Sequence, residues 1–225
     1  MQRRNLILGG LAVVGLGGWA LNNSMGSNST PINPLANAAN AQATSGDVDT
    51  SAIQEMVIGN PDAAVTVIEY ASFTCPHCAA FHAGPFKQLK SEYIDTGKIK
   101  FIYREVYFDR YGLWASMIAR CSGDDKFFGI ADLIYKGQSE WARAGEPAAI
   151  VDELRKIGRL AGLESDVIEA CLQDADKAKT LVAWDEANRE VDKINSTPSF
   201  MINGQQHSNM AYGEMKALLD AALEG

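Results

Sequence analysis

The chain has 225 residues, 47% of them hydrophobic, and a formal net charge of −8. This hydrophobic content is enough to build one packed core, so we expect a folded domain rather than a disordered chain. Basic residues are outnumbered by acidic ones, 20 against 28, and they form no cluster, which argues against nucleic acid as a partner.

Residues 1–21 have the composition of an export signal. Arg3 and Arg4 precede an apolar, glycine-interrupted run of 16 residues, which is shorter than the ~20 residues that cross a bilayer. Adjacent arginines also occur in twin-arginine signals. Small-residue cleavage sites come only later, between residues 36 and 41. A retained membrane anchor therefore stays open as an alternative to a cleaved signal.

Residues 22–52 are rich in Asn, Ser, Ala, Pro and Gly and carry few large apolar side chains. Such a composition cannot build a core, so we predict a flexible linker. It shows no heptad pattern, and we therefore expect no oligomerisation stalk and a monomeric protein. The folded domain is predicted over residues 53–225.

The first half of this domain has the pattern of a β-α-β unit. The run Val65–Phe73 is rich in β-branched and aromatic residues, which is typical of a buried strand. A helix is predicted over residues 76–96, with a kink at Pro85 because proline removes a helical hydrogen bond. A second strand is predicted over residues 98–106.

The segment from about residue 109 to 175 is predicted to be a helical insertion. Apolar side chains recur at four-residue spacing at Leu113, Met117 and Cys121, as on one face of a helix. Pro147 suits the first turn of a later helix in the same segment.

The second half of the domain returns to strands. After a further helix that ends near Ile194, we predict a strand at Ser199–Ile202. Asn203 and Gly204 are typical of a hairpin turn into another short strand. A last helix is predicted over Tyr212–Leu223.

Cys75, Pro76, His77 and Cys78 follow directly after the first predicted strand. Pro76 suits the first helical position, so Cys75 is expected at a helix N-terminus. Unpaired N–H groups and the helix dipole stabilise a thiolate there and lower the pKa of Cys75. Cys78, one turn later, would act as the resolving thiol. His77 would add positive or donor character when protonated, or it is simply an exposed side chain.

A metal site or a haem attachment site suits these two cysteines less well than redox chemistry does. A structural zinc site needs four ligands, and the remaining cysteines and histidines lack the spacing for a second pair. Covalent haem attachment needs histidine directly after the second cysteine, where this chain has Ala79. We therefore expect no metal and no cofactor. A purely structural disulfide in so small a ring would be strained and easily reduced, which again indicates redox chemistry.

A second motif, Thr197-Pro198, lies at the start of the later predicted strand. Taken alone, Thr-Pro before a strand is usually a turn. Together with the two cysteines it resembles the thioredoxin superfamily, in which a cis-proline loop faces the active cysteines. The detailed match is to the DsbA-like thiol–disulfide oxidoreductases of bacterial envelopes, including the Com1-like branch. It is carried by Phe73–Cys78, Thr197-Pro198, Phe200–Gly204 and Glu69.

The resemblance covers roughly residues 53–225 and implies a fold and a function. The fold class is α/β, a thioredoxin fold with a helical insertion between the β-α-β half and the cis-proline strand and hairpin half. The function is that of an oxidase in the periplasm, which donates disulfides to exported proteins through a mixed disulfide at Cys75. A quinone-linked membrane partner would then re-oxidise it.

The resemblance also assigns roles to residues outside the cysteine motif. A cis Pro198 would place the Thr197 backbone beside the sulfur atoms, where it can pair with an extended substrate strand. Glu69, within the first strand, would be a buried carboxylate that relays the proton of the resolving thiol. Alternatively, Glu69 pairs with a lysine such as Lys98 or Lys100.

Cys121 and Cys171 both lie on the apolar sides of predicted helices. Unpaired cysteines are often small core residues. In an exported protein, however, two such thiols in one insertion are expected to form a structural disulfide, because the compartment oxidises accessible pairs. A regulatory role for this pair is a further alternative.

Two functions remain open beside the oxidase. Thr197 takes the place of the valine of the best-known oxidases and is shared with isomerases and with several other DsbA-like lineages, so an isomerase or reductase on the same fold stays open. The polar linker, in place of an N-terminal dimerisation domain, argues against an isomerase. A non-enzymatic envelope protein could instead bind copper or a partner through Cys75, Cys78 and either Met201 or His207.

Overall fold

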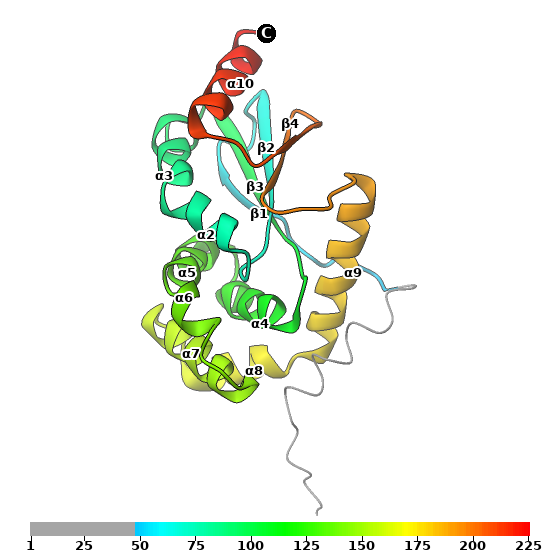
Figure 1. The fold of residues 1–225 in the computed structure, drawn as a ribbon. Helices are drawn as coiled ribbons and strands as arrows, with labels where there is room; N and C mark the ends of the chain where they lie inside the picture. The colour runs from blue at the N-terminus through cyan, green and yellow to red at the C-terminus, as the bar shows by residue number, and fades with distance from the viewer. Residues whose placement is uncertain (1–47) are drawn as a thin grey trace, which may run out of the picture. The chain divides into compact units, whose positions relative to one another are not determined.

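The computed structural model describes residues 48–225, which form a five-stranded sheet surrounded by helices (Figure 1). The predicted export signal and residues 22–47 of the predicted linker lie outside the described part of the chain. The strands lie in the order β1-β3-β2-β4-β5. They are β1 (Met56–Gly59), β2 (Val65–Ala71), β3 (Ile99–Glu105), β4 (Ser199–Ile202) and β5 (Gln205–Ser208).

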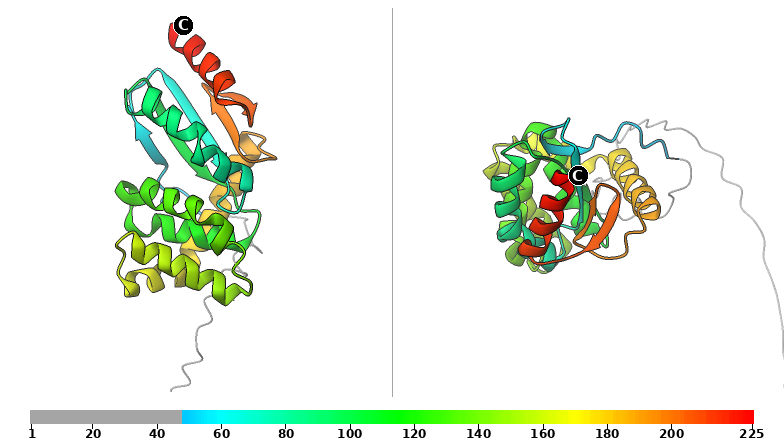
Figure 2. Two further views of the ribbon diagram at one scale, coloured as in Figure 1. Left: turned by 60° about the vertical axis from the view of Figure 1, so that its left-hand side comes forward. Right: turned by 90° about the horizontal axis from the view of Figure 1, so that it is seen from above.

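The helices divide into three groups by position in the chain. One group connects β2 to β3, one lies between β3 and β4 and includes the insertion and α9, and α10 ends the chain (Figure 2). They are α2 (Pro76–Ala83), α3 (Pro85–Leu89), a π-helical turn (Lys90–Ile94), α4 (Arg110–Ala119), a 3₁₀ turn (Arg120–Ser122), α5 (Asp124–Lys136), α6 (Gln138–Trp141), α7 (Pro147–Leu160), α8 (Ser165–Gln173), α9 (Ala175–Val191) and α10 (Tyr212–Glu224).

Strand pairing follows from the connections between the strands. β2 and β3 are parallel, with Val67 opposite Phe101, because a helical crossover joins them. The other pairs are antiparallel. β4 and β5 form a hairpin in which Asn203 and Gly204 have φ values of 46° and 81°, the left-handed conformation that tight hairpin turns require. The predicted fold class is confirmed.

The two faces of the sheet are buried by different helices. α2, α3 and α10 cover one face, where Val67, Phe101 and Phe200 belong to the main core. α9 covers part of the other face, where Tyr70 and Met201 belong to a small second cluster (Figure 1). The insertion helices α4 to α8 lie beyond the end of the sheet at which β2 ends.

The structure differs from the predicted elements at several places. β1 was not expected from the sequence; it lies at the sheet edge, paired with β3 alone. The predicted strand Val65–Phe73 ends at Ala71, so that residues 72–75 leave the sheet before α2. The predicted kink at Pro85 is a full break, since α2 ends at Ala83 and α3 begins at Pro85.

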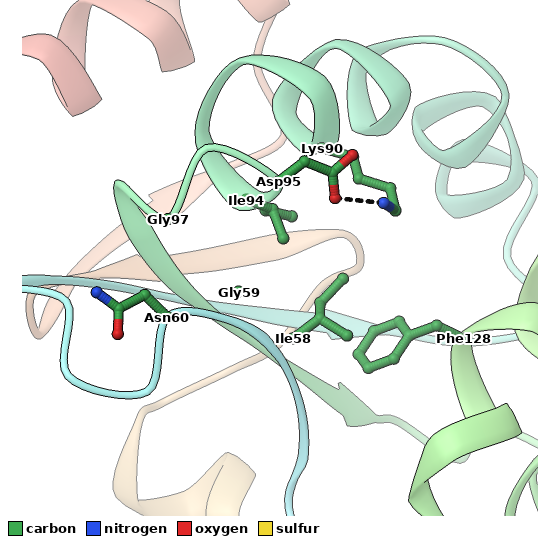
Figure 3. A pocket seen from close by; sticks show the side chains of 8 residues that line it. All are labelled: Ile58, Gly59, Asn60, Lys90, Ile94, Asp95, Gly97 and Phe128. Atoms are coloured by element: carbon green, nitrogen blue, oxygen red, sulfur yellow. Dashed lines mark hydrogen bonds and ion pairs between the residues drawn. The ribbon is translucent and has the colours of Figure 1, made fainter.

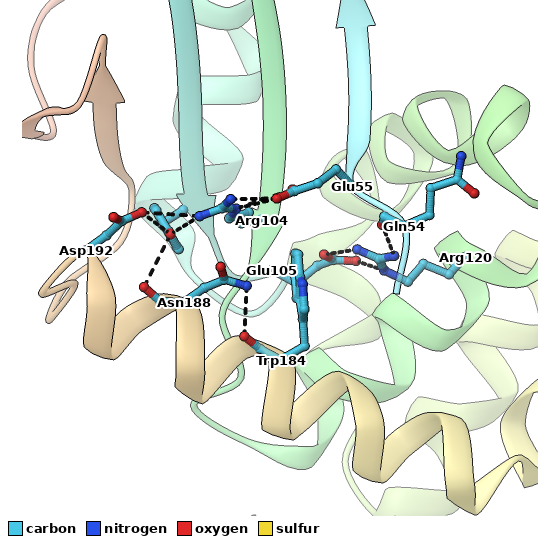
Figure 4. Close-up of polar contacts among 9 residues, drawn as sticks. Gln54, Glu55, Arg104, Glu105, Arg120, Trp184, Asn188 and Asp192 are labelled. Carbon is cyan, nitrogen blue, oxygen red and sulfur yellow. Dashed lines mark hydrogen bonds and ion pairs between the residues drawn. The ribbon is translucent and has the colours of Figure 1, made fainter. Parts of the chain in front are cut away.

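A buried ion pair joins the sheet to the insertion. Arg120 Nε donates to Glu105 Oε1 at 2.5 Å and Nη2 to Oε2 at 2.6 Å (Figure 4). The two side chains are 3% and 1% exposed. Ser116 also donates to Glu105, and Arg120 donates to the Gln54 carbonyl. The charges are thus fully compensated, which is the condition under which a buried pair is tolerated.

A second polar cluster holds α9 against the sheet (Figure 4). Arg104 on β3 donates to Glu55 and to the Tyr70 hydroxyl, which donates to Asp192 at the end of α9. Burial, followed by the hydrogen bond to Asp192, raises the pKa of Tyr70. The Tyr70 hydroxyl therefore stays protonated and remains a donor to Asp192.

The structure joins Cys121 and Cys171 in a disulfide with a Cα–Cα distance of 5.8 Å. Cys121 lies in the 3₁₀ turn after α4 rather than in the helix itself, and Cys171 lies in α8. The bridge therefore ties two helices of the insertion together, directly after the buried Arg120.

Replacing Arg120 by Met should lower the free energy of unfolding by about 3–5 kcal/mol, because Glu105 is left as an unpaired buried charge. Urea unfolding measures this loss. Replacing both residues by apolar side chains of similar size should cost clearly less. Arg155→Met is the matched control, since Arg155 pairs with Glu169 near the surface and should cost at most about 1 kcal/mol. Equal losses in R120M and R155M would contradict the assigned burial effect.

Removing the second disulfide by C121A/C171A should lower the free energy of unfolding by about 2–4 kcal/mol, because the unfolded chain then loses a cross-link that closes a long loop. The comparison is made in a background in which Cys75 and Cys78 are replaced by Ala, so that no other thiol contributes. Unchanged denaturant midpoints would show that the bridge adds no stability.

Candidate active site

The candidate site begins where the chain leaves β2 and enters α2. Cys75 is the N-cap residue of α2, with φ −81° and ψ 118°, and Pro76 takes the first helical position. The Cys75 sulfur accepts a hydrogen bond from the Cys78 N–H at 3.4 Å. Cys75 is partly exposed, whereas Cys78 is completely buried, and both are free thiols. The Cys75 thiol is thus accessible to another molecule, whereas the Cys78 thiol is covered.

Local contacts stabilise the thiolate of Cys75. The hydrogen bond from the Cys78 thiol is the largest effect, and it is opposed by the partial burial of the sulfur. A hydrogen bond from the Thr197 side chain and hydrogen bonds from the backbone N–H groups of Cys78 and His77 add to the stabilisation. The net result lowers the pKa of Cys75 from an ordinary value near 9 to about 5.

The pKa of Cys78 is shifted in the opposite direction to that of Cys75. Burial raises its pKa first, and the hydrogen bond that it donates to Cys75 and the negative charge of Glu69 raise it further. In the reduced protein at neutral pH, Cys75 is therefore the thiolate and Cys78 the protonated thiol. The helix N-terminus supports this division, because its N–H groups lie beside Cys75 only.

The second motif lies across from the cysteines. The peptide bond between Thr197 and Pro198 is cis. The Thr197 carbonyl is brought to 3.4 Å from the Cys75 sulfur, although 122 residues separate the two in sequence. His77 is exposed, and its side chain makes no hydrogen bond to any described residue; it contributes through its backbone N–H.

Glu69 lies on β2 and is completely buried, beneath the site. Its partner is His82 of α2, at 2.9 Å and 3.2 Å from Nε2 to the two carboxylate oxygens. A pairing with Lys98 or Lys100 is wrong. Successive residues of a strand face opposite sides, and the Glu69 side chain shares its face with Tyr103, opposite in the β2–β3 register, rather than with Lys100.

Three residues of the insertion, none of them singled out from the sequence, hold the segment 72–75. Gln138 Nε2 donates to the Phe73 carbonyl at 2.8 Å and to the Cys75 carbonyl at 2.9 Å. The Thr74 hydroxyl donates to Asp109 at 2.7 Å, and Tyr135 donates to the carbonyl of Ser72. Asp109 had a signal, since Asp before a predicted helix is a common N-cap, and it caps α4. Gln138 had none.

A groove of about 480 Å³ lies apart from the cysteines (Figure 3). It is formed where β1 ends, beside the π-helical turn and α5, and the ion pair of Lys90 and Asp95 lies at its rim. None of the residues that line it belongs to the cysteine motif or the Thr197-Pro198 loop. Within residues 48–225 no group of three His, Cys, Asp or Glu side chains is arranged to hold a metal ion. No helix in this part of the chain is long and apolar enough to cross a membrane.

Comparison with known proteins agrees with this geometry. A curated relative from Rickettsia bellii, named "Putative protein-disulfide oxidoreductase", is 37% identical over 171 residues, which are 76% of this chain and 65% of the relative. "Disulfide bond formation protein D" of Bacillus subtilis is 24% identical over 176 residues, 75% of this chain and 77% of the relative. The chain thus spans slightly less than two thirds of the length of the rickettsial relatives.

Solved structures give the same result. Alpha-DsbA1 of Wolbachia pipientis superposes with a TM-score of 0.71 and 26% identity, over 76% of this chain and 92% of that protein. Oxidised BdbD of Bacillus subtilis superposes with a TM-score of 0.66 and 23% identity, over 76% and 94%. The resemblance to DsbA-like proteins that the sequence predicts is confirmed. Residues 51–221 match the family model described as Thioredoxin, and the chain therefore belongs to the thioredoxin family.

Proposed function

We propose that the protein is a thiol–disulfide oxidoreductase that works as an oxidase, donating the Cys75–Cys78 disulfide to other proteins. The observation that carries this proposal is the contrast between the two thiols. Cys75 has a pKa of about 5, and burial keeps Cys78 protonated. A thiolate as stable as that of Cys75 is a good leaving group, which favours the reduced protein and makes its disulfide a strong oxidant.

The exchange proceeds in two displacements. A substrate thiolate attacks the Cys75 sulfur, forming a mixed disulfide, while the Cys75–Cys78 bond breaks and the Cys78 sulfur takes up a proton. A second substrate thiolate then attacks the substrate sulfur of the mixed disulfide, and Cys75 leaves as a thiolate. Two electrons pass from the substrate thiols to the Cys75–Cys78 pair, and the substrate gains a disulfide.

Substrate binding is proposed at the Thr197-Pro198 loop. The Thr197 carbonyl lies at the Cys75 sulfur, where a backbone group can pair with an extended peptide. Phe108, 55% exposed, precedes Asp109, whose carboxylate contacts Thr74. An apolar side chain of a substrate could lie against this ring.

The remaining parts of the proposal concern the compartment and the partners. Residues 1–21 are proposed to direct export to the periplasm, as a cleaved signal or as a membrane tether. The substrates would be exported proteins that have yet to fold. A quinone-linked membrane protein would return the reduced pair to the disulfide, and the protein would act as a monomer.

Alkylation of the reduced protein by iodoacetamide should follow the Cys75 thiolate, with a rate that rises with pH around a midpoint of about 5. Cys78 should stay unmodified across this range because it is buried and protonated. Mass spectrometry after quenching identifies the modified thiol. The variant C78A keeps the backbone N–H but loses the thiol donor, so its midpoint should move upward; a midpoint near 9 in the native protein would contradict the proposed thiolate.

The reduction potential, equilibrated against glutathione, should be more oxidising than that of glutathione. Above pH 5 the reduced pair holds one proton, on Cys78, so the potential should fall by about 30 mV per pH unit. Below pH 5 both thiols are protonated, and the potential should fall by about 60 mV per pH unit. A strongly reducing potential would overturn the oxidase proposal and favour a reductase on the same fold.

A further inference from the structure

His82 is a buried titratable group to which the two displacements at Cys75 assign no role. It lies in the last turn of α2 and is 5% exposed. Its ring stacks on that of Tyr135, with centroids 4.3 Å apart, and Nε2 contacts both carboxylate oxygens of Glu69. A histidine held so firmly has a defined direction for each ring nitrogen: Nε2 faces Glu69, and Nδ1 has no hydrogen-bond partner among the described residues.

Glu69 itself has no route to water except through its neighbours. The carboxylate is completely buried, and His82 is its one hydrogen-bond partner within residues 48–225. His82 is among the residues that line a cavity of about 60 Å³ between α2, α3 and α5. A water molecule needs about 10–15 Å³ of such space, so the cavity can hold more than one. His82 thus separates the buried carboxylate from water.

The reaction requires such a connection. Cys78 must gain a proton when its disulfide opens and lose one when it closes, because burial and the charge of Glu69 strongly disfavour its thiolate. The described hydrogen bonds include none between the Cys78 thiol and Glu69, so the first transfer needs a bridging water. Glu69 must then exchange that proton with solvent before the next turnover.

We propose that His82 carries this proton between Glu69 and the water of the cavity. Before closure, the ring hydrogen of neutral His82 is on Nδ1 and Nε2 is free to accept. When Cys78 attacks a mixed disulfide at Cys75, the Cys78 proton passes to Glu69, Glu69 passes a proton to Nε2, and the Nδ1 hydrogen leaves to water, so that the ring ends with its hydrogen on Nε2 facing Glu69. The Cys75–Cys78 bond forms, and the bond from Cys75 to the departing sulfur breaks. Opening of the disulfide runs the same path in reverse. The inference rests on the proposed exchange at Cys75 and Cys78.

The surroundings of His82 fit a path for protons. The residues that line the cavity include Lys87 and the ion pair of Lys136 with Asp132, whose polar groups are available to water. The hydroxyls of Tyr103 and Tyr135 are also buried near His82. Burial raises their pKa values, so both hydroxyls remain neutral. The titratable and charged groups that face His82 from the elements packed against it are Glu69, Lys87, Tyr103, Asp132, Tyr135 and Lys136.

The opposing view is that the pair of Glu69 and His82 only fastens α2 to β2. His82→Gln separates the two views, because the glutamine amide can still form a hydrogen bond with Glu69 but cannot carry a proton. A fastening role predicts a change in stability with unchanged chemistry of Cys78. A proton-carrying role predicts that the steps at Cys78 slow down while the attack by Cys75 does not.

The test mixes the reduced protein with oxidised glutathione and quenches with acid and alkylating agent, with masses read at each time. The rate of mixed-disulfide formation reports Cys75, and the rate of ring closure at saturating glutathione disulfide reports Cys78. In H82Q, closure should slow by at least about tenfold at neutral pH, with formation unchanged. Glu69→Gln should slow closure to a similar extent. The double variant E69Q/H82Q should close no more slowly than either single variant, because both residues lie on the same proton path.

Two further variants keep the test decisive. Glu92→Gln, which removes an exposed carboxylate from the π-helical turn, is the matched control and should close at the native rate. If H82Q does not fold, Ala83→Leu narrows the cavity while leaving His82 and Glu69 in place, and it should also slow closure. Unchanged closure in the folded variant, or effects of H82Q and E69Q that multiply, would overturn the role of His82. Failure of Cys75 to form the mixed disulfide at all would instead overturn the proposed function.

Discussion

Hydrogen bonding from Cys78 to the sulfur of Cys75, by its thiol and by its backbone N–H, is the interaction on which the proposed chemistry of this protein depends. It exists because the chain turns from strand into helix at Cys75, so that the N–H groups of the first helical turn have no carbonyl partner within the helix and that of Cys78 donates to the sulfur. The same turn buries Cys78 one helical turn later. One backbone feature therefore produces both a stable thiolate and a buried, protonated thiol.

The insertion holds the segment that leads from β2 into α2 in place. Gln138 and Asp109, together with the hydroxyl of Tyr135, bind segment 72–75 through its carbonyls and the Thr74 side chain. The insertion is in turn joined to β3 by the buried pair of Glu105 and Arg120. The position of the Cys75 sulfur is therefore determined from both sides, by the sheet that precedes it and by helices that follow it in the chain.

Much of the fold was predictable because its signals are local. The parallel pair of strands, the hairpin at Asn203 and the disruption of the helix at Pro85, predicted as a kink, depend on β-branched runs, on the left-handed preference of Asn-Gly and on the missing N–H of proline. β1 has no comparable local signal, since a four-residue edge strand is stabilised by pairing with β3 rather than by its own sequence.

The sequence by itself determined the reactive unit: Cys75 and Cys78 at the start of a helix, and a Thr-Pro turn before a later strand, which are chemical consequences of neighbouring residues. The tertiary structure alone decided the partners of this unit. Nothing in the sequence distinguishes His82 from the other two histidines; the folded structure does, because Glu69 lies on the face of β2 that α2 covers. Gln138 likewise stands out only because the insertion brings its amide to the Cys75 carbonyl. Such contacts join residues 13 to 63 positions apart, and no local pattern specifies which side chains meet across that distance.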